Sequence, residues 1–350
     1  MSALRGVWLT NVGSAVLHSR QAIVEAMQLL ADAGFNAVFP VVWNKGFTLY
    51  PSRVMGEHFG VEIDPLYAEQ GRDPLAEVIE EAGRAGIRTV IPWFEYGFAC
   101  AARADGGHIL AARPEWRACE RGGALLVKNG LAWMNAFDPQ VQAFLIDLIV
   151  EVAENYPVQG VQGCDRLPGL PVEGGYDPLT LRRYAAATGR EVPFDPQERR
   201  WLQWRADELT AFLERLRMCI KAVRSDLLLS LAPAVYPFSL THLLQDVKAW
   251  SEQELFDLLH PQVYRENFRA YKVEIDKFGR YLSSAALERT APGIALKANG
   301  TELSREDLLR CVALNRDRKL LGEVFFFYEG LRADGGSKAH WLGNGPYAPS

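Results

Sequence analysis

Short apolar runs alternate with amphipathic segments along most of the chain. Apolar runs of strand length lie at 5–11, 35–43, 87–96, 158–165, 227–233, 256–264, 292–298 and 322–330. Segments with helical spacing of apolar residues lie at 20–33, 74–86, 139–156, 178–189, 197–225, near 240–249, near 266–284 and at 304–317. Regular alternation of strands and helices implies a parallel sheet. Eight such units in 350 residues favour an α/β fold of the (β/α)8 TIM-barrel type.

The first helix shows how the pattern sets element limits. Ile23, Met27 and Leu30 recur at helical spacing, Ser19 is a suitable N-cap, and Gly34 follows the last turn. Longer segments rich in glycine and proline follow the second, third and fourth strands, and we predict them to be loop insertions. We expect one barrel domain over 1–350.

Composition and motifs disfavour several classes of function and leave the fold prediction unchanged. The chain is 49% hydrophobic, and its net charge of −5 is spread over mixed acids and bases. It has no basic stripe of the kind that binds nucleic acid and no apolar run of about 18 residues that would span a membrane. No GxGxxG follows the first strand and no P-loop motif occurs, which disfavours nucleotide-binding folds.

Metal and redox chemistry also lack sequence support. The cysteines are odd in number and scattered, and no CxxC, HxH or HExxH motif occurs. We therefore predict free thiols, no metal site and no cofactor. The chain enters its first strand almost at once, so we expect a cytoplasmic protein, unless an export segment is missing from this sequence.

The residues at the predicted strand ends indicate the chemistry, because TIM-barrel active sites lie there. Aromatic and amide side chains of this kind stack on sugar rings and bind hydroxyl groups. The candidate substrate-binding residues are Trp8, Asn11, Trp43, Asn44, Trp93, Tyr96, Gln162, Cys164, Tyr236, Gln262, Tyr264 and Tyr328. Hydrolysis of a glycoside needs two carboxylates, and the candidate catalytic residues are Glu95, Asp165 and Glu329.

Each candidate also has an ordinary structural interpretation. Asp165 has Arg166 beside it and could simply form an ion pair, and Trp43 and Trp93 could belong to the core at the barrel rim. Glu173 is more typical of a loop turn. His260, inside a strand, is more typical of a core histidine.

Several sequence blocks resemble one known family. "RGVWLTNVGSAVL", "FNAVFPVVWNKGFTLYPS", "VIPWFEYGF", "GVQGCDRLP", "LAPAVYPFS", "HPQVYREN" and "VFFFYEGL" together are similar to the glycosyl-hydrolase-like family 10 proteins. The resemblance runs from Arg5 to about Leu331. It implies a (β/α)8 barrel, glycosidase activity on a bacterial polysaccharide, which in one member is the glycan strand of peptidoglycan, and a glycan as partner. Relatives are often extracytoplasmic.

One position departs from the family pattern. The fourth strand of relatives typically ends in two adjacent aspartates, and here the first is Cys164 while the second is Asp165. Side chains alternate along a strand, so Gln162 and Cys164 share a face, which we expect to point inward. Three functions stay open: a glycosidase, a carbohydrate-binding barrel weakened or inactivated by the cysteine, and a lyase that uses Lys297 as a Schiff-base amine.

Overall fold

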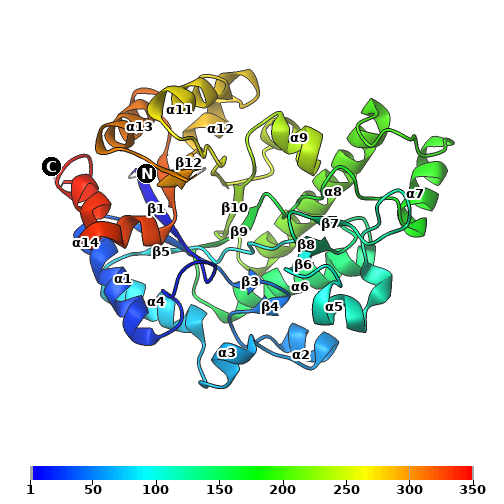
Figure 1. Cartoon of the computed structure of the whole chain (residues 1–350), viewed down its shortest axis with the longest axis horizontal. Coiled ribbons are helices and arrows are strands. Elements are labelled where there is room, and N and C mark those ends of the chain that lie inside the picture. The colour runs from blue at the N-terminus through cyan, green and yellow to red at the C-terminus, as the bar shows by residue number, and fades with distance from the viewer. Residues whose placement is uncertain (1–2, 299, 349–350) are drawn as a thin grey trace.

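Parallel strands follow one another around the middle of the molecule in chain order (Figure 1). The computed structural model describes residues 3–298 and 300–348. Within this part, eight parallel strands are β1 (Leu4–Leu9), β2 (Ala37–Pro40), β5 (Thr89–Val90), β9 (Gly160–Cys164), β10 (Leu228–Ala232), β11 (Leu258–Leu259), β12 (Gly293–Ala295) and β15 (Gly322–Phe326). They form one sheet in the order β12-β15-β1-β2-β5 and another in the order β11-β10-β9.

Isolated parallel bridges link the two sheets on both sides. Trp93 pairs with Gln162 between the segment after β5 and β9, and Gln262 pairs with Gly293 between the segment after β11 and β12. Every strand therefore lies beside its neighbours in the sequence. The arrangement is TIM-barrel-like and mixed α/β, and it brings the carboxyl ends of the strands to one end of the molecule.

Helices cover the strands on the outside, and several begin at an Asp-Pro pair. They are α1 (Arg20–Asp32), α4 (Pro74–Arg84), α6 (Pro139–Asn155), α7 (Pro178–Thr188), α8 (Arg199–Val223) and α13 (Arg305–Asp317). Asp73, Asp138 and Asp177 cap α4, α6 and α7 through their carboxylates, and each helix starts with proline. An aspartate accepts from a free amide and proline fits the first turn, so these predicted starts are confirmed.

Three predicted limits were wrong. The helix expected near 240–249 is two helices, α9 (Phe238–Leu243) and α10 (Val247–Glu252), because Leu244 adopts a left-handed conformation with φ 59°. The helix expected near 266–284 is α11 (Phe268–Ile275), a short 3-10 turn η2 (Phe278–Arg280) and α12 (Ser284–Glu288). The eighth strand ends at Phe326 rather than near 330.

Because β15 ends early, two candidate residues lie in a helix and not on the strand where they were predicted. Tyr328 and Glu329 lie in the first turn of α14 (Tyr328–Gly343) and not on a strand. The unbroken apolar run "VFFFY" conceals this limit, because its hydrophobicity continues from the strand into the helix without a polar or glycine signal.

The segments after β2 and β5 carry small elements of their own. Between β2 and α4 lie β3 (Trp43–Asn44), β4 (Phe47–Thr48), α2 (Arg53–Phe59) and α3 (Pro65–Ala68). Between β5 and α6 lie β6 (Ala99–Ala101), α5 (Gly107–Ala112), η1 (Pro114–Trp116), β7 (Val127–Lys128) and β8 (Leu131–Trp133). Strands β6, β8 and β7 form an antiparallel sheet beside the strand ends. A further hairpin, β13 (Lys297–Ala298) and β14 (Thr301–Glu302), follows β12.

A buried polar chain crosses the interior between the strands. The indole N–H of Trp8 donates to Gln162 Oε1 at 2.6 Å, and Gln162 Nε2 donates to Ser230 Oγ at 2.8 Å. Because β1 and β9 are not neighbours, Gln162 must point inward, as alternation along the strand predicts. His260 is fully buried against Trp8, and its Nδ1 lies 2.8 Å from Ala291 O. The core histidine is therefore confirmed.

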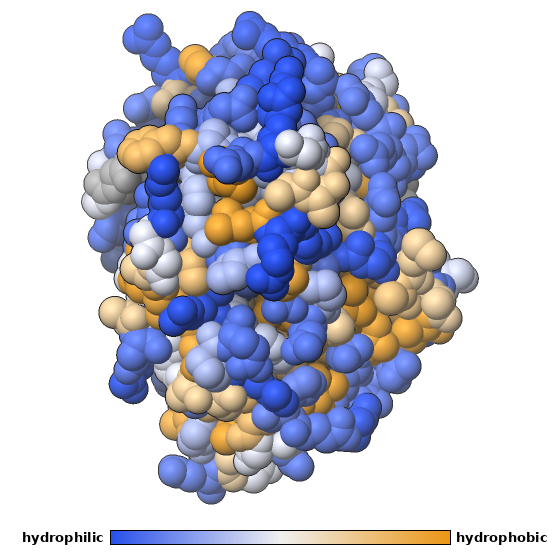
Figure 2. Space-filling view, turned by 90° about the vertical axis from the view of Figure 1, so that its right-hand side faces the viewer, coloured by the Kyte–Doolittle hydropathy of each residue, from blue (hydrophilic) through white to orange (hydrophobic). Residues whose placement is uncertain are grey.

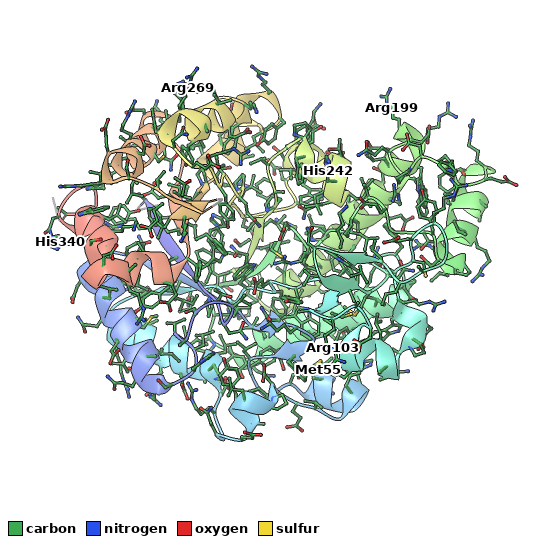
Figure 3. The ribbon with its side chains drawn as sticks, in the orientation of Figure 1. Met55, Arg103, Arg199, His242, Arg269 and His340 are labelled. Atoms are coloured by element: carbon green, nitrogen blue, oxygen red, sulfur yellow. The ribbon has the colours of Figure 1, made fainter. Side chains whose placement is uncertain are left out.

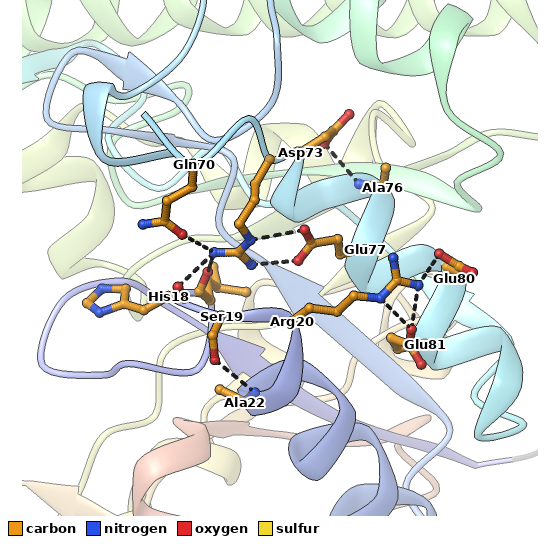
Figure 4. Close-up of polar contacts among 12 residues, drawn as sticks. His18, Ser19, Arg20, Ala22, Gln70, Asp73, Ala76, Glu77, Glu80 and Glu81 are labelled. Carbon is orange, nitrogen blue, oxygen red and sulfur yellow. Dashed lines mark hydrogen bonds and ion pairs between the residues drawn. The ribbon is translucent and has the colours of Figure 1, made fainter. Parts of the chain in front are cut away.

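Ion pairs between α1 and α4 fix the loop that leaves β1 (Figure 4). The guanidinium of Arg72 makes two hydrogen bonds to the carboxylate of Glu77, at 3.0 and 2.5 Å, and donates to the carbonyl of His18 at 2.7 Å. Arg20 at the start of α1 bridges Glu80 and Glu81 of α4. Such bidentate pairs add geometric specificity, so the loop after β1 is held from outside the strand ring.

Candidate active site

A cavity of about 460 Å³ opens beside the carboxyl ends of β9, β10 and β11. Three of the candidate residues, Asp165, Gln262 and Tyr264, contribute to its wall. The other lining residues come from the β7–β8 turn, the loop after β9, the loop after β10, α9 and the segment after β11: Lys128, Asn129, Pro171, Glu173, Ala234, Val235, Phe238, His242, Leu243 and Arg265. The cavity thus lies where the fold predicts an active site.

Two of the three candidate carboxylates share one arginine. Arg166 Nη2 lies 3.6 Å from Glu95 Oε1 and 3.9 Å from Asp165 Oδ1. These two oxygens are therefore at most about 7.5 Å apart. The ion pair between Asp165 and Arg166, which the sequence suggested as a purely structural role for Asp165, is present. Arg166 also forms an ion pair with Glu95. Arg166 Nε is fixed by a 2.8 Å bond to the carbonyl of Glu95.

Glu95 is more deeply buried than Asp165. The Glu95 side chain is 11% exposed, whereas the Asp165 side chain is 26% exposed and faces the cavity. Asn44 Nδ2 donates to Glu95 Oε2 at 2.5 Å. Burial raises the pKa of Glu95 above its usual value, although Arg166 and the Asn44 hydrogen bond act in the opposite direction. A raised pKa suits a carboxyl that must carry a proton.

Cys164 occupies a fully enclosed position behind this pair. Its thiol is 2.8 Å from the carbonyl of Glu95 and 3.7 Å from that of Phe94, and the amide of Arg166 donates to Sγ at 3.3 Å. Burial raises the pKa of the Cys164 thiol well above its usual range. The group therefore stays neutral and contacts backbone rather than the cavity. The other cysteines among residues 3–298 and 300–348 are likewise free thiols.

Two tyrosines complete the surroundings of the pair. Tyr264 is stacked on Phe326, with ring centroids 5.1 Å apart, and burial raises its pKa well above the usual value, with Asp165 adding to the effect. Arg166 lies over the ring of Tyr96 at 5.5 Å from its centroid. The arginine therefore contacts two carboxylates and an aromatic face, which fixes its position.

The structure does not place Glu329 with the other two carboxylates. Its Oε1 accepts from Ser14 Oγ at 2.6 Å, and its Oε2 accepts from Arg332 Nε at 2.6 Å. Both carboxylate oxygens are thus engaged between α14 and the loop after β1. These contacts describe a carboxylate that ties a helix start to a loop.

The candidate tryptophans are buried and offer little ring surface to a sugar. Trp8, Trp43 and Trp93 are 1%, 0% and 4% exposed. Trp43 donates to the carbonyl of Gly97 at 2.9 Å and packs on Phe144, whereas Trp93 Nε1 has no partner in the described chain. The remaining candidates lie in varied surroundings: Tyr328 is buried, Asn11 is half-buried, and half-buried Tyr236 packs on Tyr281.

An exposed aromatic platform, which the sequence pattern does not predict, lies on α9. Phe238 on α9 is 48% exposed and is stacked on His242, with ring centroids 4.1 Å apart and planes 13° apart. Both side chains line the cavity, and His242 is labelled on α9 in Figure 3. The short helix has no strong hydrophobic period, so no sequence pattern indicates this platform.

The β7–β8 turn supplies the opposite wall. Lys128 Nζ bonds to Glu173 Oε1 at 2.5 Å, which joins the turn to the loop after β9. Asn129 and Gly130 both have positive φ, 53° and 75°. This Asn-Gly pair is the strongest short-range hairpin signal, so the turn was open to prediction, whereas its contact with Glu173 was not.

Other chemistry has little support in the described chain. No group of three or more His, Cys, Asp or Glu side chains in residues 3–298 and 300–348 is arranged to hold a metal ion. Lys297 lies exposed on the β13–β14 hairpin, without the burial that activates a Schiff-base lysine. No helix in the same part of the chain has the length and apolarity needed to cross a membrane.

A TIM-barrel-like fold with neighbouring carboxylates at the strand ends is typical of glycoside hydrolase-like barrels. The model of one family, Glycosyl hydrolase-like 10, matches residues 3–294, and the chain belongs to this family. The chain is 22% identical over 302 residues to the Glycosyl hydrolase DigH of Escherichia coli strain K12, a match that covers 75% of this chain and 65% of that protein.

Solved structures of glycoside hydrolases share the fold. The glycoside hydrolase domain of PgaB (BpsB) from Bordetella bronchiseptica superposes with a TM-score of 0.70 at 13% identity, covering 97% of this chain and 99% of that one. The catalytic domain of β-amylase from Paenibacillus polymyxa superposes with a TM-score of 0.67 at 10% identity, covering both chains fully. At such identities the likeness concerns the fold alone.

Proposed function

We propose that this protein is a glycoside hydrolase that acts on a bacterial polysaccharide, with Asp165 and Glu95 as its carboxylate pair. The eight strands would close into a complete barrel, with the insertions after β2, β5 and β9 forming the cleft around its mouth. Family membership and the glycoside hydrolase folds of its neighbours support the reaction class.

The shared contact with Arg166 is the observation that carries the proposal. It holds two carboxylates from adjacent strand ends within about 7.5 Å. Retaining glycosidases place their carboxyl groups about 5–5.5 Å apart and inverting ones about 6.5–9.5 Å. The bound of about 7.5 Å between these two oxygens is compatible with the spacing of either class, and this supports the pair as the catalytic carboxylates.

The two environments divide the roles. Glu95, whose pKa is raised by burial, is the better general acid for the leaving oxygen. Asp165, paired with Arg166 and facing the cavity, is the better base or nucleophile. Phe238 would stack on a sugar ring at the cavity rim, and Gln262 would bind hydroxyl groups.

The substrate class rests on the relatives. The family model and the relative DigH are both named as glycosyl hydrolases, which supports a glycan substrate. The resemblance of the sequence blocks to this family makes peptidoglycan glycan strands the first candidate. Hydrolysis is tested by incubating the purified chain with such glycans and measuring new reducing ends, alongside Asp165→Asn and Glu95→Gln. Loss of product in both variants supports the proposal, and unchanged turnover in either removes that residue from the pair.

One observation favours a second function, a glycan-binding barrel without turnover. The family resemblance implies an aspartate at the position of Cys164, and Glu95 is enclosed by Asn44 and Arg166. Under this reading the protein binds glycans but releases no reducing ends at any protein concentration. Binding measured by calorimetry without product formation would decide for it.

A further inference from the structure

A second cavity, of about 440 Å³, lies on α7 and the segment that follows it. Its wall is made by Arg121, Tyr176, Leu181, Arg182, Ala185, Arg190, Glu191, Val192 and Pro193. It shares no lining residue with the candidate active site. α7 lies at the right of Figure 1, and the face turned to the viewer in Figure 2 shows apolar surface among the polar side chains.

The cavity combines an apolar floor with an uncompensated positive rim. Leu181, Val192 and Pro193 present half-buried apolar side chains. The charged residues of the wall are three arginines and one glutamate, so the wall has a net positive charge. Within the described chain, the guanidinium groups of Arg182 and Arg190 have no ion pair or hydrogen bond, and Arg121 lies only over the ring of Phe194, at 3.6 Å.

A buried hydroxyl in the same wall lacks a partner. Tyr176 is 8% exposed, and its hydroxyl oxygen, closed off from solvent, has no hydrogen-bond partner in the described chain. Buried polar groups are almost always paired, so the Tyr176 hydroxyl in this wall has a free donor that a bound acceptor could reach after a small side-chain movement. Beside it, Phe194 is 78% exposed, which leaves a large apolar ring uncovered.

We propose that this cavity binds a small apolar carboxylate, with the aromatic or branched aliphatic body on the floor and the anion at the arginines. Its volume is that of a small-molecule site, and guanidinium groups match a carboxylate geometrically. The carboxylate would also give the Tyr176 hydroxyl its acceptor. The site is independent of glycan hydrolysis.

The test uses three ligands of one shape: 2-naphthoate, the neutral 2-naphthamide and the cationic 2-naphthylmethylamine. Calorimetry at low salt should show saturable binding of 2-naphthoate, at least about fivefold tighter than the amide, because nearby charges strengthen the contact as ionic strength falls. The amine should bind least. Equal binding of all three, or no saturable binding of 2-naphthoate, would overturn the proposal.

Variants of the full chain locate the site. Ala185→Trp, on the exposed face of α7 and in the cavity wall, should abolish binding, and Arg182→Ala with Arg190→Ala should remove the preference for the carboxylate. Tyr176→Phe should weaken it severalfold. Arg199→Ala is the matched control, an exposed arginine that lies outside the cavity (Figure 3), and should change nothing.

Two further outcomes would contradict a small-molecule site in this cavity. Unchanged 2-naphthoate affinity in Ala185→Trp would place the ligand elsewhere. Sedimentation with phosphatidylglycerol vesicles that depends on Arg182 and Arg190, without binding of free 2-naphthoate, would identify a lipid surface as the partner and contradict the small-molecule site.

Discussion

Replacing Arg205 by methionine should loosen the loop that forms one wall of the candidate active site. Arg205 is fully buried on α8, and its Nη1 donates to the carbonyls of Val172 and Gly174 at 2.5 and 2.6 Å. Its Nη2 donates to Pro196 O at 2.5 Å, and its guanidinium lies over Trp201 at 4.4 Å. No carboxylate pairs with it in the described chain.

The magnitude follows from these contacts. A hydrogen bond to a charged group contributes about 1.5–3 kcal/mol, and each carbonyl left unpaired in the interior has a cost of similar size. Methionine keeps the apolar stem and removes a buried charge, which offsets part of the loss. We therefore expect Arg205→Met to lower the free energy of unfolding by about 3–5 kcal/mol, a large share of the about 5–15 kcal/mol typical of a protein.

Urea unfolding followed by tryptophan fluorescence measures the global loss, and amide hydrogen exchange locates it. The amide of Val172, bonded to His242 O at 2.9 Å, should exchange faster, because the loop loses its anchor. Arg199→Met, at an exposed position of the same helix, is the control and should leave both measurements unchanged. A loss below about 1 kcal/mol with unaltered exchange at Val172 would refute the reasoning.

Three further predictions test other parts of the structure. Cys164→Asp should destabilise the fold by about 2 kcal/mol or more, because a buried carboxylate would face the Phe94 and Glu95 carbonyls. Cys164→Ser should lower the thermal unfolding temperature less than Cys164→Asp does, and the reverse order would contradict this. Burial lowers the pKa of His260 to about 4, so its neutral form stabilises the fold above the unfolded pKa of about 6.5, and that stability should be lost as the pH falls from about 6.5 to 4. The difference in unfolding free energy between wild type and His260→Gln should change over this window, and a constant difference would be evidence against it. Phe238→Ala should weaken glycan binding about two- to twelvefold, since an aromatic contact contributes about 0.5–1.5 kcal/mol, and unchanged affinity by calorimetry would exclude Phe238 as a platform.

Local sequence signals accounted for most of the helix starts and for the order of the strands. Caps such as Ser19 and the Asp-Pro pairs act within one turn, so they can be read without knowledge of the tertiary fold. The end of β15 could not be read, because "VFFFY" is apolar on both sides of the strand limit. Similarly, the sequence showed Trp8 near a strand end but not that its ring fills the interior.

The candidate site was partly open to prediction. Their positions at strand ends predict Asp165 and Glu95, and their contact with Arg166 connects the carboxyl ends of adjacent strands, as the topology requires. The same rule predicts Glu329, but β15 ends at Phe326 and Glu329 lies in α14. The aromatic platform and the Lys128–Glu173 pair depend on contacts between irregular segments, which have no sequence period to signal them.

The release of reducing ends from bacterial glycans, peptidoglycan glycan strands included, tests the central proposal most directly. The wild-type chain should release them, whereas Asp165→Asn and Glu95→Gln should each reduce the rate about a hundred- to ten-thousandfold, the usual contribution of a positioned acid or base. Glu329→Gln, whose carboxylate is tied to Ser14 and Arg332, should stay within severalfold of wild type. Turnover that survives in Asp165→Asn, or no release by the wild-type chain from any glycan that it binds, would contradict the proposal.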